Sequence, residues 1–111
     1  MLFVCTANID RSPTAESIYK NDPDFDVKSA GISQYAKMPV SEKLLEWADV
    51  VFCMENFQKN YIRDKYPEIV INKEMYTLNI PDNYIYRDPE LISRIEEIME
   101  PWLLTYRQTK S

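Results

Sequence analysis

The sequence contains no histidine and only one glycine, Gly31, among its 111 residues. Without histidine the chain can form no histidine-based catalytic triad, no histidine general base and no histidine metal site. With a single glycine it cannot contain the phosphate-binding motifs GxGxxG or GxxxxGK[ST]. Other side chains must therefore carry any catalytic chemistry.

Positive charge, cysteine and long apolar runs are also scarce. The 13 Lys+Arg residues are outnumbered by 18 Asp+Glu residues, and this net charge of −5 argues against a nucleic-acid partner. The two cysteines, Cys5 and Cys53, lack the CxxC spacing of zinc sites, so we expect free thiols and a cytoplasmic location. No apolar run approaches the roughly 20 residues that cross a bilayer, and the run Met1–Cys5 is too short for a signal peptide, so no membrane contact is expected.

The remaining composition, 45% hydrophobic and 28% charged residues, is that of one globular domain, which we place at residues 1–111. Apolar runs predict strands at 2–5, 26–30, 50–54 and 69–71, with residues 75–78 ambiguous. Helices are expected from Ser12, over 39–47 and 56–66, and from Pro89, with Pro101 kinking or ending the last one near Glu100. This alternation predicts a three-layer α/β fold, a four-stranded parallel sheet with helices on both faces.

The segment between the first strand and the first helix carries the chemistry. Cys5 ends the strand, five residues follow, and Arg11 precedes Ser12, which we expect to cap the helix. The N–H groups of such a loop, the positive end of the helix and a guanidinium can together bind a tetrahedral anion, and they favour the thiolate of Cys5. At the carboxyl end of a parallel strand, this thiolate would be placed to attack phosphorus.

A structural interpretation competes with this one. The spacing Cys-x5-Arg arises often by chance, and a cysteine on a strand is usually a small core residue. The preceding strand, the Ser12-Pro13 helix start and the lack of any other nucleophile–base pair favour the anion-binding interpretation. Cys53 is expected to pack in the core.

Val4-Cys5-x5-Arg11-Ser12-Pro13-x-Ala15-Glu16 resembles the signature of the low-molecular-weight protein tyrosine phosphatases, whose loop and fold the thioredoxin-coupled arsenate reductases share. The similarity continues through Val27–Gly31 and Ala48–Met54. It resumes at Asp82-Asn83-Tyr84, which resembles the family's Asp-Pro-Tyr loop. The sequence is most similar to a compact bacterial subgroup of predicted protein tyrosine phosphatases.

The resemblance implies a role for each matching residue. Cys5 would be the nucleophile, Arg11 would bind the phosphoryl oxygens, and Asp82 would be the general acid and then the general base. Tyr84 would form an aromatic wall against a substrate ring, while Ser12 and Ser29 would hydrogen-bond the loop or the thiolate. The phosphate would be bound by the loop residues Thr6, Ala7, Asn8, Ile9 and Asp10, with Asn8 in a left-handed conformation. No metal and no cofactor are implied.

Several positions depart from the family pattern. Asp10 replaces a cysteine, and its carboxylate would oppose phosphate binding unless it points away, is neutralised or pairs with Arg11. Ala7 replaces a glycine, Asn83 replaces the proline after the acid, and the supporting histidine is missing. The stretch between Ser29 and Ala48 is short, so a loop that covers the substrate is expected to be trimmed.

The expected function is therefore a metal-independent, protein tyrosine phosphatase-like hydrolase. It would cleave phosphotyrosine or other aryl phosphates, on a protein or a small molecule, through a phosphocysteine intermediate. Three alternatives stay open: a catalytically weak module that binds phosphate or phosphopeptides, an arsenate reductase and, more distantly, a cysteine that accepts phosphate from a carrier protein. The competing general acid, Asp88, precedes Pro89 and is expected to be a helix cap. The oligomeric state and the physiological substrate stay undetermined.

Overall fold

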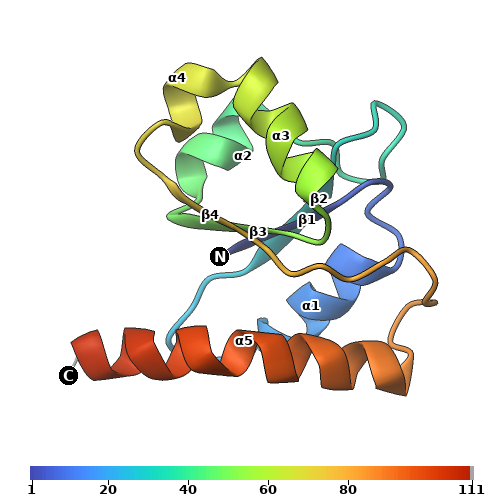
Figure 1. The fold of residues 1–111 in the computed structure, drawn as a ribbon, viewed down its shortest axis with the longest axis vertical. Coiled ribbons are helices and arrows are strands. Elements are labelled where there is room, and N and C mark those ends of the chain that lie inside the picture. The colour runs from blue at the N-terminus through green and yellow to red at the C-terminus, as the bar shows by residue number, and fades with distance from the viewer. Residues whose placement is uncertain (111) are drawn as a thin grey trace.

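Four parallel strands form one sheet in the order β2-β1-β3-β4 in the computed structural model, which describes residues 1–110 (Figure 1). The strands are β1 (Leu2–Cys5), β2 (Lys28–Gly31), β3 (Val50–Cys53) and β4 (Glu74–Thr77). Cys5 pairs with Gly31 on one side of β1, and Val4 pairs with Cys53 on the other. The central strands β1 and β3 are buried throughout, which explains their unbroken apolar runs.

Helices cover both faces of this sheet, so the predicted three-layer arrangement is confirmed (Figure 1). The helices α1 (Arg11–Tyr19) and α5 (Pro89–Lys110) lie on one face. The other face is covered by α2 (Glu42–Trp47), α3 (Asn56–Lys65) and α4 (Pro67–Val70). Successive strand residues point to opposite faces, so Phe3 and Cys5 join the α1–α5 core while Leu2 and Val4 join the other.

The predicted strand at 69–71 is wrong, because this segment belongs to the short helix α4 and to the turn after it. Pro67 occupies the first turn of that helix, where its missing N–H costs nothing. Ile71 is 77% exposed, which a strand buried on both faces would not allow. The fourth strand is instead β4, in the region left ambiguous by the sequence.

Pro101 was expected to kink the last helix or to end it near Glu100. The end is wrong, because the helix continues to Lys110. Upstream of the proline, Leu91, Ile95 and Met99 are almost completely buried, which stabilises the helix by about 1.5–3 kcal/mol each. Beyond it, Trp102 packs edge-on against Phe52, with ring centroids 5.2 Å apart. Packing on both sides of Pro101 therefore outweighs the hydrogen bond that the proline cannot make.

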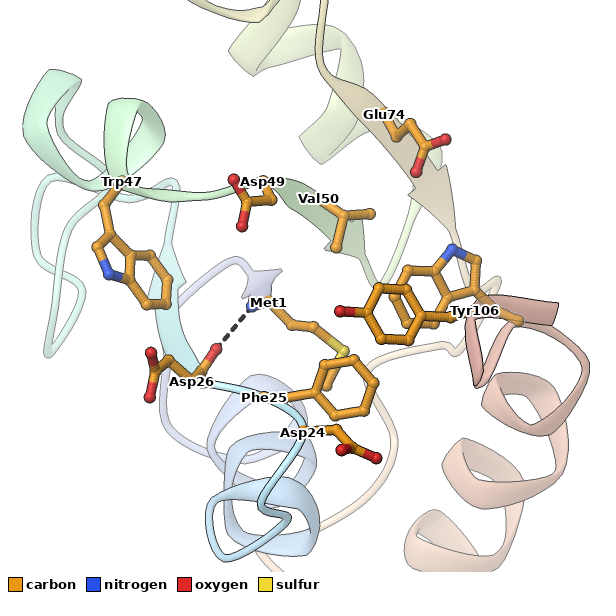
Figure 2. A pocket seen from close by; sticks show the side chains of 10 residues that line it. Met1, Asp24, Phe25, Asp26, Trp47, Asp49, Val50, Glu74 and Tyr106 are labelled. Atoms are coloured by element: carbon orange, nitrogen blue, oxygen red, sulfur yellow. Dashed lines mark hydrogen bonds between the residues drawn. The ribbon is translucent and has the colours of Figure 1, made fainter. Parts of the chain in front are cut away.

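The two ends of the sheet differ in charge. At the amino ends of the strands, a pocket of about 270 Å³ is lined by aromatic side chains and by four carboxylates, those of Asp24, Asp26, Asp49 and Glu74. Figure 2 shows the ammonium of Met1 beside it, donating to the carbonyl of Asp26 at 2.7 Å. No three Cys, Asp or Glu side chains in residues 1–110 are arranged to hold a metal ion. Four carboxylates disfavour an anion in this pocket, and neither cysteine lines it, so oxyanion chemistry is expected at the carboxyl ends of the strands.

Candidate active site

Loop 6–10 connects the carboxyl end of β1 to α1 and encloses a small cavity. The cavity has a volume of about 210 Å³ and is lined by Cys5, Ala7, Ile9, Asp10, Arg11 and Asp82. All six are residues that the sequence predicted for the site. We call this space the Cys5 cavity.

Among the helices of residues 1–110, none is both long and apolar enough to span a bilayer.

The Cys5 sulfur is surrounded by hydrogen-bonding groups. The backbone N–H of Asn8 donates to Sγ at 3.2 Å, and Oγ of Ser12 lies 3.0 Å from Sγ. The first turn of α1 begins at Arg11, so its free amides and the positive end of its dipole lie beside the sulfur. A backbone N–H and a helix N-terminus are groups that favour an anion beside them, and the thiolate is the nucleophilic form of cysteine.

A buried network holds loop 6–10 in shape from behind. Asn8 has a φ of 56°, the left-handed conformation that the sequence predicted for it. Its side-chain amide donates to the hydroxyls of Ser12 and Ser29, both at 2.9 Å. The Ser29 hydroxyl in turn donates to the carboxylate of Glu16. The expected participation of Ser12 and Ser29 in a loop-supporting network is confirmed, and no histidine is needed for it.

The position of Ser12 in the helix differs from the expectation. The helix begins at Arg11, the capping position is Asp10, and the Asp10 side chain makes no capping hydrogen bond. Thr14 instead joins the end of the loop to the helix, because its N–H and its hydroxyl both donate hydrogen bonds to the carbonyl of Asp10. The Ser12 hydroxyl does not cap the helix; it contacts the Cys5 sulfur and donates to the carbonyl of Ala30 at 3.2 Å.

Further contacts attach loop 6–10 to its neighbours. The Gln58 side chain at the start of α3 donates to the hydroxyl of Thr6 at 3.2 Å, so the Thr6 side chain is held by α3. The backbone N–H groups of Ser33 and Lys37 donate to the carbonyls of Thr6 and Ala7. The loop is therefore fixed from both sides by main-chain and side-chain bonds.

Arg11 is held in place by Glu55, a residue that sequence reasoning missed. The guanidinium is almost fully buried, and its Nη1 donates to Oε1 of Glu55 at 2.5 Å and to the carbonyl of Ile80 at 2.8 Å. Glu55 and Gln58 also form a capping box at the start of α3. A carboxylate followed three residues later by a glutamine indicates a helix start in the sequence, but this spacing gives no indication of a contact with Arg11.

Asp82 lies across the Cys5 cavity from the loop. Its side chain is 67% exposed, and Oδ1 is 3.7 Å from Nε of Arg11. The segment that carries it is anchored at both ends: the Ile80 carbonyl accepts from Arg11, and the N–H of Arg87 donates to Thr14 at 2.8 Å. The carboxyl group is thus exposed to solvent and still close to the anion-binding side chain.

Asp10 lines the cavity and is partly buried. Within residues 1–110 its carboxylate makes no ion pair, whereas Arg11 pairs with Glu55 and Asp82. The suggested Asp10–Arg11 pair is therefore absent. The cavity combines one guanidinium and a helix N-terminus with a carboxylate on its own loop.

The expected wall residue Tyr84 is not at the cavity. Its ring is buried in the α1–α5 core, and its hydroxyl accepts from Arg94 at 3.2 Å. The next two residues, Ile85 and Tyr86, are the exposed apolar side chains of this segment. The expected cap Asp88 accepts from the N–H of Glu90 at 2.9 Å, as a helix-capping residue does.

The second cysteine lies on the opposite face of the sheet. Cys53 belongs to the α2–α4 core, whereas Cys5 belongs to the α1–α5 core. Burial raises the pKa of the Cys53 thiol to about 12, so this thiol stays protonated. As expected, Cys53 is a core residue.

Comparison with known proteins agrees with this geometry. The model of the family described as low molecular weight phosphotyrosine protein phosphatase matches residues 1–49. A protein-arginine-phosphatase of Geobacillus stearothermophilus is 35% identical over 92 residues. That alignment covers 61% of this chain and 62% of the relative, so the chain spans less than two thirds of the relative's length.

Solved structures share the fold over nearly the whole chain. The YwlE arginine phosphatase from Geobacillus stearothermophilus has a TM-score of 0.73 and 24% identity, covering 98% of this chain and 92% of that one. A low molecular weight protein tyrosine phosphatase from Streptococcus pyogenes has a TM-score of 0.76 and 17% identity, covering 94% and 90%. The predicted resemblance to the low-molecular-weight phosphotyrosine protein phosphatase family is confirmed in sequence over residues 1–49. Nearly the whole chain shares the fold of these solved phosphatases.

Proposed function

We propose that this protein is a phosphatase that removes phosphate from protein side chains through a phosphocysteine intermediate on Cys5. One observation carries the proposal: Cys5, Arg11 and Asp82 line the same cavity. A nucleophile, an anion-binding group and a proton donor therefore meet in a space large enough for a phosphoryl group. The family relationship supports the same chemistry.

In the first step, the Cys5 thiolate attacks phosphorus. A sulfur–phosphorus bond forms, the bond from phosphorus to the leaving atom breaks, and Asp82 gives its proton to that atom. Charge on the transferring group is stabilised by the loop amides, the start of α1 and Arg11. Nη1 of Arg11 is bonded to Glu55 and Ile80, which leaves its Nε–Nη2 edge for two phosphoryl oxygens. Asp82, whose Oδ1 is 3.7 Å from Nε, makes no hydrogen bond to this edge and lies beside the bound group.

In the second step, the Asp82 carboxylate takes a proton from water. The water oxygen bonds to phosphorus, the sulfur–phosphorus bond breaks, and phosphate leaves as Cys5 returns to the thiolate. Asp82 ends the cycle protonated, ready for the next substrate. Its exposure of 67% gives solvent water access to the carboxylate.

The leaving group is an aryl oxygen or a guanidinium nitrogen, and different observations favour each. Ile9 is exposed at the rim of the cavity and offers an apolar surface to a flat aromatic ring, as in phosphotyrosine. Asp10 and Asp82 present carboxylates that would attract the positively charged guanidinium of phosphoarginine. The arginine phosphatase among the relatives supports this second candidate.

The alternatives considered above make different demands on the site. Arsenate reduction needs further reachable thiols, and Cys53 is buried on the wrong face of the sheet. A pure binding module would need the anion site but no proton donor, and the placement of Asp82 beside Arg11 favours an enzyme.

Steady-state hydrolysis of p-nitrophenyl phosphate tests the proposal. We expect Cys5→Ser to abolish turnover and Asp82→Asn to lower kcat by about 10²–10⁴-fold. Phosphotyrosine and phosphoarginine peptides of the same sequence then decide the leaving group. Binding of vanadate without turnover of any of these substrates would instead support a binding module.

A further inference from the structure

We infer that a groove beside loop 6–10 binds the segment of the substrate protein that flanks the phosphorylated residue, and that it selects an apolar and an acidic side chain there. We call it the β2 groove; its lining includes Ile9, Lys28, Lys37, Met38, Leu44 and Tyr86. The inference deepens the proposed function and rests on it. The occupant of the groove is a peptide segment that carries one apolar and one acidic side chain.

The position of the groove relative to the Cys5 cavity supports this assignment. Ile9 lines both spaces, so the groove begins where the cavity ends. Its volume is about 720 Å³, compared with about 210 Å³ for the cavity. It extends to Lys28, which begins β2, whereas Gly31 at the end of β2 lies against the loop. Three residue steps along a strand span about 10 Å, so the groove has room for about three residues of an extended peptide.

The apolar part of the groove comes from three segments that are distant in sequence. Ile9 of loop 6–10, Met38 of the segment before α2, and Tyr86 of the segment before α5 are 59%, 53% and 50% exposed. Single exposed apolar residues are ordinary, but exposed apolar residues from three segments around one hollow indicate a binding surface.

The charged part of the groove favours an acidic partner although the protein is acidic overall. Its one carboxylate, that of Glu16, already accepts from the Ser29 hydroxyl. The Lys37 backbone donates to Ala7, which keeps this lysine beside the loop. In the part of the chain that the structure describes, no carboxylate lies within 4.0 Å of the Lys37 ammonium. A substrate carboxylate would therefore meet an unpaired cation.

Lysine-to-glutamate exchange tests the groove. Two phosphopeptides are compared, one with leucine and glutamate beside the phosphorylated residue and one with leucine and lysine. We expect Lys37→Glu to lower kcat/KM for the glutamate peptide by about tenfold and to raise it for the lysine peptide. p-Nitrophenyl phosphate carries no peptide segment to occupy the groove, so its kcat/KM measures what the charge reversal does to the Cys5 cavity alone. The loss for the glutamate peptide should exceed that change by about tenfold.

The matched control is Lys43→Glu, the same charge reversal at an exposed position of α2 that does not line the groove. It should change none of the three activities. A second variant, Met38→Ser, should weaken kcat/KM for peptides with leucine more than for the same peptides with glycine at that position. Equal effects of Lys37→Glu and Lys43→Glu on both peptides would overturn the inference.

Peptide-binding measurements distinguish a failure of this inference from a failure of the proposed function. The affinity of both peptides for Cys5→Ser, measured by fluorescence anisotropy, needs no turnover. Lys37-dependent affinity without any turnover in the parent protein would contradict only the phosphatase proposal. Turnover with Lys37-independent affinity would contradict only the groove. Sedimentation that shows a dimer dissociated by Lys37→Glu would also overturn the inference, because a second copy would then occupy the groove.

Discussion

Gly31 lies so close to Thr6 that a Cβ atom at position 31 would stand 2.5 Å from the Thr6 carbonyl oxygen and 2.9 Å from the Asn8 nitrogen. The only glycine of the chain is thus a point where the backbones of β2 and loop 6–10 approach closely. Both neighbours are backbone atoms, so a side chain here could be accommodated only by moving the loop. The position of the Cys5 sulfur therefore depends on a residue that contributes no side chain.

Gly31→Ala should displace loop 6–10 and weaken catalysis. We expect kcat for p-nitrophenyl phosphate to fall by at least about tenfold, with a stability loss of about 1–3 kcal/mol from overpacking. Activity and urea unfolding measured on the same preparation check both effects. Gln34→Ala, at an exposed position in the segment that follows β2, is the matched control and should change neither. Normal activity in Gly31→Ala would show that the loop is not set by this contact.

Glu55→Ala should weaken phosphate binding through Arg11. It removes the carboxylate that fixes Nη1 and leaves a buried guanidinium with the Ile80 carbonyl and a more distant Asp82. We expect a loss of about 1–3 kcal/mol in stability and a lower vanadate affinity. Glu55→Gln keeps an oxygen acceptor and should lose less of both. Equal vanadate affinity in the parent protein and both variants would contradict a positioning role for Glu55.

Asp10→Asn should strengthen anion binding. The substitution removes a negative charge from the wall of the Cys5 cavity and keeps the shape of the side chain. We expect a several-fold lower inhibition constant for phosphate and for vanadate, measured against p-nitrophenyl phosphate. If the guanidinium of phosphoarginine is recognised by this carboxylate, the same variant should hydrolyse phosphoarginine peptides more slowly. Unchanged values for both would mean that Asp10 does not act on the bound anion.

Stability should fall at alkaline pH because two buried groups resist ionisation. Burial raises the pKa of the Cys53 thiol from 9.0 and the pKa of the Tyr19 hydroxyl from 10.0, in each case to about 12. The unfolded chain therefore releases these protons first, and stability present below about pH 9 is lost as pH rises towards 12. Urea midpoints between pH 8 and 11 measure this slope. Cys53→Ala should flatten it, and an identical slope in that variant would contradict the contribution of Cys53.

The sequence predicted most strongly those features that a few neighbouring residues determine. The apolar runs of β1 and β3 and the Cys5–Arg11 segment are local, and the structure contains all three. The strand expected at 69–71 failed because Pro67 starts a short helix there. Of the two outcomes expected at Pro101, a kink or an end, the end is wrong because Trp102 packs against Phe52, a residue distant in sequence.

The site residues that are close together in the sequence were predicted, and those contributed by distant parts of the sequence were not. Cys5, Asn8 and Arg11 share one loop, but Glu55 reaches Arg11 across 44 residues. Tyr84 was expected at the cavity because Asp82-Asn83-Tyr84 resembles the family's Asp-Pro-Tyr loop. The direction of its ring is instead set by the core and by Arg94. Which side chain of residues 84–86 faces outward depends on packing that the sequence does not display.

The central claim is that Cys5 becomes covalently phosphorylated, and trapping that intermediate tests it most directly. Asp82→Asn should slow its hydrolysis, because the general base for water is lost. Rapid quench of this variant with p-nitrophenyl phosphate, followed by intact-protein mass spectrometry, should show the mass of one added phosphoryl group, located by peptide mapping at Cys5. Release of p-nitrophenol with no phosphoprotein, or with phosphate on a residue other than Cys5, would contradict the account.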